Sequence, residues 1–380
     1  MTAKKRILIV SFSDIKRDPR VYRQVKHLCP LYDVVTLGFK TSGLEGVDFI
    51  PILEKGNSLP KKVLRAMRLK AHDYPGYYNA TFDIERVRES LKGQRFDLIL
   101  ANDSDSLPLV FSWDHGTPVL HDAHEYAPRQ IEDQWWWRFL MQDYMDWICK
   151  TYLTRCAEIT TVSQGIANEY SRNYGVRPKV ITSAPDFVDL KPSAVEEGRI
   201  RLVHHGNANP NRKIENYLDL MDLLDERFNL DLYLMPRDPS YLTRIKRKAA
   251  ACKRVKVLDP VPMQDLVHTC NKYDIGMFLQ EPLNFNLKNS LPNKFFEFVQ
   301  ARLLVAVTPL PEIERYVHDL DLGLVSKGFT PESMAKELLG LDRKKVEHYK
   351  LQSHLHAMEL SSGPNLALLD GLVDNLIAKG

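Results

Sequence analysis

Residues 284–300 read NFNLKNSLPNKFFEFVQ, and this stretch shows most clearly how the chain is built. Its first part is polar and typical of a turn. We expect Ser290 to cap a helix in whose first turn Pro292 fits. From Asn293 onward the residues favour a helix whose apolar side chains are spaced to pack inward. The first backbone N–H groups, at about residues 291–294, would lack helical partners and form a natural seat for a phosphate.

Glu297 lies about one turn into the expected helix, on its inward side, and the neighbouring sequence offers it few partners. A carboxylate accepts several hydrogen bonds, so the hydroxyls of a sugar or a ribose would supply the donors that it lacks. The stretch therefore predicts a phosphate seat at a helix start, next to an acid that binds a diol.

Outward from this stretch, short apolar runs alternate with helical patterns along the chain, which predicts parallel sheets covered by helices. A chain of 380 residues exceeds one ordinary core, so we expect two doubly wound domains. We place them at residues 1–185 and 186–360, with a linker at 186–198 and a last segment, 361–380, whose helix crosses back to the first domain. The expected strands are residues 6–10, 32–37, 97–101, 118–121, 159–162, 179–181, 200–204, 230–234, 255–258, 275–278 and 303–307.

Composition narrows the class of protein. Hydrophobic residues make up 44% and charged residues 27%, as in soluble globular proteins. A net charge of +3 is too small to indicate a nucleic-acid partner. The five cysteines form no C-x-x-C pair, which favours neither a disulfide framework nor a zinc site. No run approaches the ~20 apolar residues of a membrane span. We expect a cytoplasmic protein, and a peripheral contact with the inner face of a membrane stays open.

Several motifs together resemble a known family. LPNKFFEF, LVAV and LPEI resemble the donor-site signature of family-4 glycosyltransferases, and three further motifs follow the order of that family. The six motifs lie at residues 291–298, 304–307, 310–313, 119–125, 161–166 and 205–212. The resemblance implies the GT-B fold, an α/β architecture of two Rossmann-like parallel-sheet domains facing across a cleft. It also implies a retaining enzyme that takes a nucleotide-sugar donor and uses neither a metal nor another cofactor.

The resemblance assigns the donor site to the second half of the chain. Glu297 matches the second acid of the family's Glu-x7-Glu motif, which holds the ribose hydroxyls. The first acid of that motif is replaced by Asn289, which can still bind a hydroxyl but carries no charge. Backbone amides at the helix start would hold the diphosphate. The expected donor-binding residues in this stretch are Asn289, Ser290, Leu291, Pro292, Asn293 and Glu297.

A second part of the donor site would come from the loop after Gly206. Arg212 stands where the family usually has the lysine that meets the diphosphate, and the adjacent Lys213 could share that role. Cations are needed there because negative charge grows on the leaving group as the glycosidic bond breaks. The family's other cation, directly after the glycine, is replaced by Asn207. The resemblance thus implies a phosphate clamp that is less basic than usual.

His124 matches the histidine that the family places beside the donor sugar, and Glu125 follows it. With His121 it forms an H-x-x-H pattern, but residues three apart on a strand face opposite sides, so we do not expect a metal site. A core or supporting role is the alternative for both histidines. Asp103 and Asp105 resemble a D-x-D metal motif, but they directly follow a strand, where capping of the next helix accounts for them.

The acceptor is expected on the first domain. Its loop at residues 11–20 lacks the glycines of many family members and offers Ser13, Arg17 and Arg20, which could bind an anionic group. A solvated basic loop is the alternative. Residues 61–70 carry five cations among apolar side chains, and residues 135–141 add three tryptophans. Both segments could form an interfacial surface for a lipid-linked acceptor, or be an ordinary helix surface and a sugar-stacking site.

These expectations combine into one function. We expect a hexosyl- or N-acetylhexosaminyl-transferase that moves a sugar from a nucleotide-diphosphate sugar, with uracil the family's commonest base. The acceptor would be a hydroxyl of a saccharide or a lipid-linked saccharide in bacterial surface polysaccharide or glycolipid synthesis. A nucleotide-sugar epimerase of the same fold and a non-catalytic nucleotide-sugar-binding protein are the alternatives, the latter favoured by Asn207 and Asn289.

Overall fold

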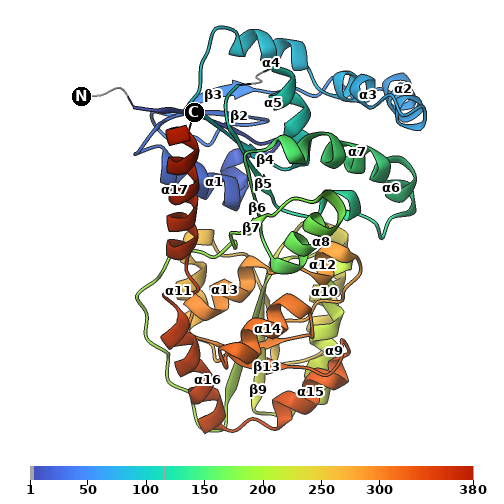
Figure 1. Ribbon diagram of the computed structural model, residues 1–380. Coiled ribbons are helices and arrows are strands. Elements are labelled where there is room, and N and C mark those ends of the chain that lie inside the picture. The colour runs from blue at the N-terminus through green and yellow to red at the C-terminus, as the bar shows by residue number, and fades with distance from the viewer. Residues whose placement is uncertain (1–3, 114–115, 380) are drawn as a thin grey trace. The chain divides into compact units, whose positions relative to one another are not determined.

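The computed structural model describes residues 4–113 and 116–379, and these form two compact units. Unit 1 comprises residues 1–181, 284–286 and 366–380, and unit 2 comprises residues 182–283 and 287–365. Each unit is an entirely parallel sheet covered by helices (Figure 1). The predicted fold class, two doubly wound α/β domains, is therefore confirmed.

The sheet of unit 1 has the strand order β3-β2-β1-β4-β5-β6-β7. The order reverses between β1 and β4, and in such sheets ligands bind at the carboxyl ends of the strands next to this reversal. The strands are β1 Arg6–Val10, β2 Asp33–Gly38, β3 Asp48–Pro51, β4 Leu98–Asn102, β5 Val119–Ala123, β6 Glu158–Thr161 and β7 Lys179–Val180. The helices are η1 Ile15–Arg17, α1 Pro19–Leu28, α2 Leu59–Lys70, α3 Tyr74–Thr81, α4 Ile84–Leu91, η2 Ser104–Ser106, α5 Leu107–Trp113, η3 Ala127–Arg129, α6 Trp135–Leu140, α7 Gln142–Tyr152, η4 Leu153–Arg155 and α8 Gln164–Tyr174.

Both faces of this sheet are buried, as the apolar strand β1 illustrates. Ile7 and Ile9 contribute to the core beneath α1, whereas Leu8 and Val10 contribute to the core on the other face. Alternate residues of a strand point to opposite faces, so a continuous apolar run suits a strand that is covered on both sides.

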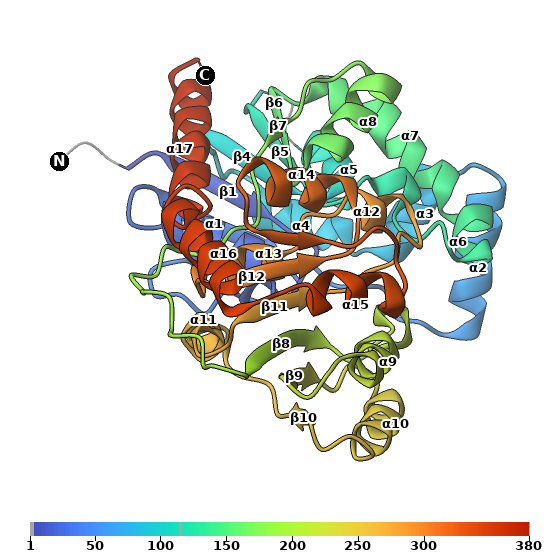
Figure 2. The same cartoon turned by 90° about the horizontal axis from the view of Figure 1, so that it is seen from below.

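The last helix, α17 (Ser362–Lys379), completes the core on the α1 face of unit 1. It lies beside α1 (Figures 1 and 2). Asp370 Oδ1 lies 2.7 Å from His27 Nε2, and Tyr32 donates a hydrogen bond to Asp374. Its four apolar residues in this core are Leu369, Leu372, Val373 and Leu376. Burial of one such side chain typically stabilises a fold by roughly 1.5–3 kcal/mol, so α17 is part of the stability of unit 1.

The sheet of unit 2 has the order β10-β9-β8-β11-β12-β13 and reverses between β8 and β11 (Figure 2). Its strands are β8 Ile200–Asn207, β9 Phe228–Met235, β10 Val255–Leu258, β11 Ile275–Phe278, β12 Leu304–Val307 and β13 Gly323–Val325. Its other helices are η5 Pro210–Arg212, α9 Glu215–Leu223, α10 Pro239–Ala249, η6 Met263–Asp265, α11 Leu266–Asn271, α13 Asn293–Gln300, α14 Pro311–Asp319, α15 Pro331–Leu339 and α16 Arg343–His356. The short helix α12 (Phe285–Lys288) joins the two units along the chain.

Several details differ from the sequence predictions. The two sheets gain β3 and β13, edge strands whose residues are mostly only partly buried and which therefore show no apolar run. The first unit ends at residue 181, four residues before the expected boundary, because the expected linker packs on unit 2: its Val188 and Leu190 carbonyls accept hydrogen bonds from Arg302. Residues 284–286, expected in the second domain, belong to unit 1 because the Asn286 side chain pairs with the backbone of Tyr126.

Candidate functional site

The donor-side residues of unit 2 gather at the carboxyl end of β8, next to the reversal of strand order. Gly206 has φ 137°, a backbone conformation that favours glycine. A β-carbon at this position would lie 2.6 Å from Cε and 2.8 Å from Nζ of Lys294. Lys294, in the first turn of α13, thus lies directly against Gly206. Only a residue without a side chain leaves room for this contact.

Lys294 is a cation that the sequence predictions missed. Burial lowers its pKa to about 8, the nearby Arg212 contributes to this shift, and Glu297 opposes it. No described residue forms a hydrogen bond or an ion pair with its ammonium group. A half-buried ammonium without such a partner is costly unless a ligand anion compensates it. The sequence contains one indication of this cation, since Lys294 lies within the predicted phosphate seat at residues 291–294.

Arg212 is the last residue of the short helix η5, and Lys213 follows it. Nη1 of Arg212 donates to Oε1 of Gln280 over 2.7 Å, and Nζ of Lys213 lies 2.5 Å from Oε2 of Glu281. Lys213 adopts a left-handed conformation with φ 43°. The structure therefore brings Arg212 close to Lys294, whereas it engages Lys213 in an ion pair with Glu281. Asn207 is exposed at the end of β8.

Glu297 lies one turn after Lys294 and is only 9% exposed. Its Oε2 is 3.3 Å from Nε2 of His205. Burial, followed by the charge of Lys294, holds the pKa of His205 well below its usual range, so this contact joins a carboxylate to a neutral ring. Its geometry is not that of a hydrogen bond, since Nε2 of His205 has none. The carboxylate thus lies within a mostly buried and predominantly basic group of side chains.

The turn before α13 differs in detail from its prediction. The helix starts at Asn293 with Pro292 in the capping position, and no side chain caps it. The expected cap by Ser290 is wrong, because its hydroxyl donates instead to the carbonyl of Leu287 at the end of α12. Asn289 is partly buried in the same turn, and Leu291 is buried in the core.

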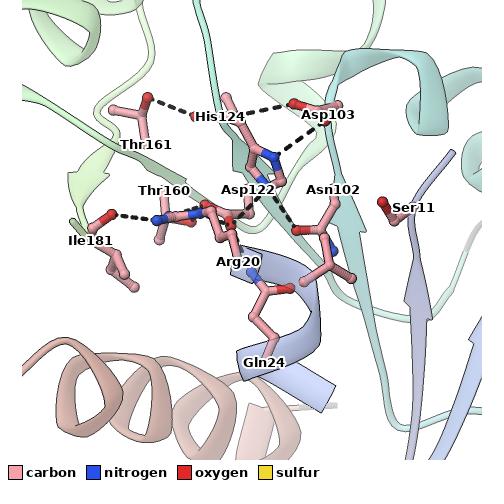
Figure 3. Close-up of polar contacts among 12 residues, drawn as sticks. Ser11, Arg20, Gln24, Asn102, Asp103, Asp122, His124, Thr160, Thr161 and Ile181 are labelled. Carbon is pink, nitrogen blue, oxygen red and sulfur yellow. Dashed lines mark hydrogen bonds and ion pairs between the residues drawn. The ribbon is translucent and has the colours of Figure 1, made fainter. Parts of the chain in front are cut away.

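The corresponding group in unit 1 is centred on Asp122, near the carboxyl end of β5 (Figure 3). Arg20 binds this buried carboxylate with two nitrogens, each at 2.7 Å. Gln24 and Thr160 donate further hydrogen bonds to it over 2.6 and 2.7 Å. Burial alone would raise the pKa of Asp122, but Arg20 and His124 hold it well below its usual range. Arg20 also donates to the carbonyl of Ile181.

His124 follows β5 directly and lies between two carboxylates (Figure 3). Nδ1 is 3.3 Å from Asp103, and Nε2 is 3.4 Å from Asp122 and 3.1 Å from Oδ1 of Asn102. Burial alone would lower the pKa of His124, but Asp103 and Asp122 raise it to about 9. The imidazole is therefore a cation at neutral pH, able to donate a hydrogen bond or to stabilise negative charge.

This charge has a consequence for stability. Because the pKa of His124 in the fold, about 9, exceeds its ordinary value of 6.5, its contribution to stability is complete below pH 6.5. We expect it to be lost as the pH rises through 9. A nuclear magnetic resonance titration of the imidazole should place its midpoint near 9 and, in Asp103→Asn, clearly lower. A midpoint near the ordinary value in the native protein would contradict this assignment.

Asp103 corrects one sequence prediction. It precedes η2, but its carboxylate makes no capping hydrogen bond, so helix capping does not account for it. It accepts instead from the backbone N–H of His124 over 3.3 Å, in addition to its contact with the ring. Asp103 also has φ 56°, an uncommon conformation for a residue other than glycine. His121 is the expected core histidine, with Nδ1 donating to the carbonyl of Ala101.

The predicted acceptor-side residues do not form one group. Glu125 lines a cavity of about 200 Å³ in unit 1, together with Asp103 and Asp105. Burial and then the charge of Asp103 raise the pKa of Asp105 to about 7. The other lining residues are Phe12, Ser104, Ala127, Gln130 and Met145. Arg20 is engaged by Asp122, Arg17 is exposed at the surface, and the hydroxyl of Ser13 hydrogen-bonds that of Ser11.

Within the part of the chain that the structure describes, no three or more His, Cys, Asp or Glu side chains are grouped so that they could hold a metal ion. No helix in residues 4–113 and 116–379 is both long and apolar enough to span a membrane.

Comparisons with known proteins agree with this architecture. Sucrose-phosphate synthase from Thermosynechococcus elongatus superposes with a TM-score of 0.75 at 11% identity, over 99% of this chain and 100% of that one. HepE from Anabaena, solved in complex with UDP and glucose, gives 0.69 at 12% identity over 98% and 100%. WaaG, a glycosyltransferase involved in lipopolysaccharide biosynthesis, gives 0.64 at 10% identity over 97% and 99%. Such identities show the fold alone, and no curated protein sequence matches the chain.

The sequence match falls on the first half of the chain, although the quoted donor-site motifs lie in the second. Residues 20–192 match the family model described as Glycosyltransferase Family 4. The resemblance inferred from the motifs is therefore confirmed: this chain has the GT-B fold and resembles the glycosyltransferases of family 4.

Proposed function

We propose that this protein transfers a sugar from a uridine-diphosphate sugar to a hydroxyl acceptor, with retention at the anomeric carbon. The observation that carries the proposal is the group of Gly206, Lys294 and Arg212 where the sheet of unit 2 reverses. Gly206 has no side chain, so the oxygens of a diphosphate could come close to its backbone. The positive charges of Lys294 and Arg212 beside it would neutralise the negative charge of those oxygens. The structure of HepE, a chain of the same fold, contains UDP and glucose, which supports the choice of donor.

In this arrangement the diphosphate and the ribose of the nucleotide sugar are each bound by their own residues. Lys294 and Arg212 bind the diphosphate and stabilise the charge that grows as the bond from the anomeric carbon to the phosphate oxygen breaks. Glu297 accepts hydrogen bonds from the two ribose hydroxyls. The acceptor oxygen bonds to the anomeric carbon on the same face, and its proton passes to the leaving diphosphate. Lys294 also supplies the positive charge that is missing at Asn207, where the family has a cation. This weighs against the alternative of a non-catalytic nucleotide-sugar-binding protein.

Unit 1 would bind the acceptor and position it. The charged His124 donates a hydrogen bond to the sugar. Asp122 contacts the imidazole and Arg20 binds Asp122, so these two act as positioning residues that hold the imidazole in place. The cavity lined by Asp103, Asp105 and Glu125 offers several acceptors for sugar hydroxyls. A hexosyl or N-acetylhexosaminyl group is the expected cargo. Bacterial surface polysaccharide or glycolipid synthesis is the expected pathway, supported by the fold shared with WaaG.

Replacing Glu297 with alanine is expected to weaken binding of UDP by about a hundredfold or more, because two hydrogen bonds to a charged group are lost. Isothermal titration calorimetry with UDP measures this loss. Glu297→Ala should weaken binding of thymidine diphosphate less than binding of UDP, because thymidine diphosphate lacks one ribose hydroxyl. Glu226→Gln, on a side chain that is 94% exposed, is the control and should bind UDP unchanged. Unaltered binding by Glu297→Ala would contradict the ribose role.

Donor-dependent release of UDP tests the activity itself. The native protein is expected to release UDP from UDP-sugars, faster when a saccharide acceptor is present. Binding of UDP without release from any UDP-sugar would identify a non-catalytic protein, and conversion of one UDP-sugar into another would identify an epimerase.

A further inference from the structure

Two helices of unit 1 carry an unusual number of exposed apolar side chains. Among the described residues, nineteen large apolar side chains are exposed, and seven of them lie on α2 and α6. Leu59 is 75% and Trp135 is 72% exposed. The seven are Leu59, Val63, Leu64, Met67, Trp135, Trp136 and Phe139. We call the exposed faces of these two helices the α2/α6 surface.

The apolar residues of α2 are ordered along the helix. Leu59, Val63 and Met67 recur every four residues, so they lie on one face, and that face is not turned to the core. The opposite face carries the buried Leu69. A surface helix normally points its apolar stripe inward, whereas α2, in which Leu69 is the one buried residue, points its apolar stripe outward. α6 lies beside α2 (Figures 1 and 2), and Nζ of Lys70 rests over the ring of Phe139. The apolar stripe therefore continues from α2 onto α6.

Positive charge surrounds these apolar side chains. α2 contains five cations and no acid, and Arg138 adds one on α6. Lys61, Lys62 and Arg138 are exposed and form no ion pair in the described structure. Arg65, by contrast, is bound by the carbonyls of Lys55, Gly56 and Ala80, and Arg68 pairs with Asp73. Two of the five cations of α2 thus stabilise the fold and Lys70 contacts Phe139, whereas Lys61 and Lys62 are available to a partner.

We infer that the α2/α6 surface docks onto an anionic lipid bilayer. Apolar and aromatic side chains on one face, ringed by lysines, are the features that bind a helix in the plane of a membrane interface. Tryptophan suits this region because its ring is apolar and its N–H remains hydrated. The lysines would be attracted by the negative charge of the lipid headgroups. This inference does not depend on the transferase activity, although it would bring an acceptor carried on a lipid to unit 1.

Vesicle flotation tests the docking directly. The full chain is mixed with vesicles of phosphatidylcholine alone or of equal parts phosphatidylcholine and phosphatidylglycerol. We expect it to float with the anionic vesicles and much less with the neutral ones. Lys61→Gln/Lys62→Gln should partition about thirtyfold less onto anionic vesicles, since each lysine near the surface contributes a factor of about five to six. Trp135→Ser/Phe139→Ser should lose binding further, because both side chains insert.

Matched controls separate docking from general charge and from unfolding. Lys246→Gln/Arg247→Gln removes two exposed cations from α10 of unit 2 and should float like the native protein. All variants should keep the native circular dichroism and affinity for UDP, since the replaced side chains are exposed. Failure of the native chain to float, or unaltered flotation of both α2/α6 variants, would overturn the inference. A dimer in solution that Trp135→Ser/Phe139→Ser dissociates would also overturn it, in favour of contact between two copies.

Discussion

Replacing Lys294 with alanine is expected to lower the rate of donor-dependent UDP release by about a hundred- to a thousandfold, the usual effect of removing one group that stabilises transition-state charge. The reason is geometric: Lys294 is the cation that lies against Gly206, and no described residue neutralises it by a hydrogen bond or an ion pair. Release of UDP from a UDP-sugar, followed with saturating acceptor, measures the effect. Lys288→Ala, on an exposed lysine six residues earlier, should leave the rate unchanged.

Two further observations would distinguish a phosphate contact from a structural role. Gly206→Ala should also slow release, because its β-carbon would meet Cε of Lys294 at 2.6 Å and displace it. Affinity for UDP should fall as the pH rises through about 8, since only the protonated ammonium binds the diphosphate. Lys294→Arg should keep its affinity across that range because an arginine does not lose its charge. Native activity in Lys294→Ala would show that Arg212 alone neutralises the diphosphate.

Replacing Asp122 with asparagine is expected to lower the free energy of unfolding of unit 1 by about 3–5 kcal/mol. Asp122 is 1% exposed and receives hydrogen bonds from Arg20, Gln24 and Thr160. Without its charge, the guanidinium of Arg20 stays buried and uncompensated. Urea denaturation followed by tryptophan fluorescence is a suitable measurement, because all five tryptophans lie in unit 1.

Asp103→Asn is the matched control for this experiment. Asp103 contacts the same histidine, but its side chain is 48% exposed and does not touch Arg20 in an ion pair. We expect it to lower the pKa of His124 and, by linkage, the stability at neutral pH, but by less than Asp122→Asn, which also leaves Arg20 without its carboxylate. Equal destabilisation by the two substitutions would show that the contact with His124, rather than the Arg20–Asp122 pair, stabilises unit 1.

The two sheets could be predicted from the sequence because most of their strands are continuous apolar runs. All eleven expected strands are present. β3 and β13 were missed because they are edge strands whose residues are mostly only partly buried, so they lack an apolar run. That residues 284–286 belong to unit 1 rather than to unit 2 could not be predicted in the same way. It depends on the side chain of Asn286 pairing with the backbone of Tyr126, 160 positions away.

Candidate site residues could be named from the sequence where a residue type in a motif has one obvious use. They could not be named where tertiary contacts determine what surrounds the side chain. Glu297 and His124 were named from motifs and the phosphate seat from helix chemistry. The structure buries Glu297 beside His205 and His124 beside Asp122, and their roles stay predictions. Lys294 was overlooked because a lysine in a helix is ordinarily a surface residue, and its closeness to Gly206 is a tertiary contact. Arg20 looked free in sequence, yet it is buried against Asp122, because the partner of a buried cation is not visible in the linear order.

The helix α17 gives the chain an order in which it can fold during synthesis. Leu369, Leu372, Val373 and Leu376 complete a core whose other members, such as Ile7 and Val21, are made first. On the ribosome, domains generally fold as units, starting from the N-terminus. Here unit 1 would have to wait with part of the α1 face of its sheet uncovered until all of unit 2 and then residues 366–379 have emerged. Unit 2 is the part that can be finished first, although its synthesis begins second.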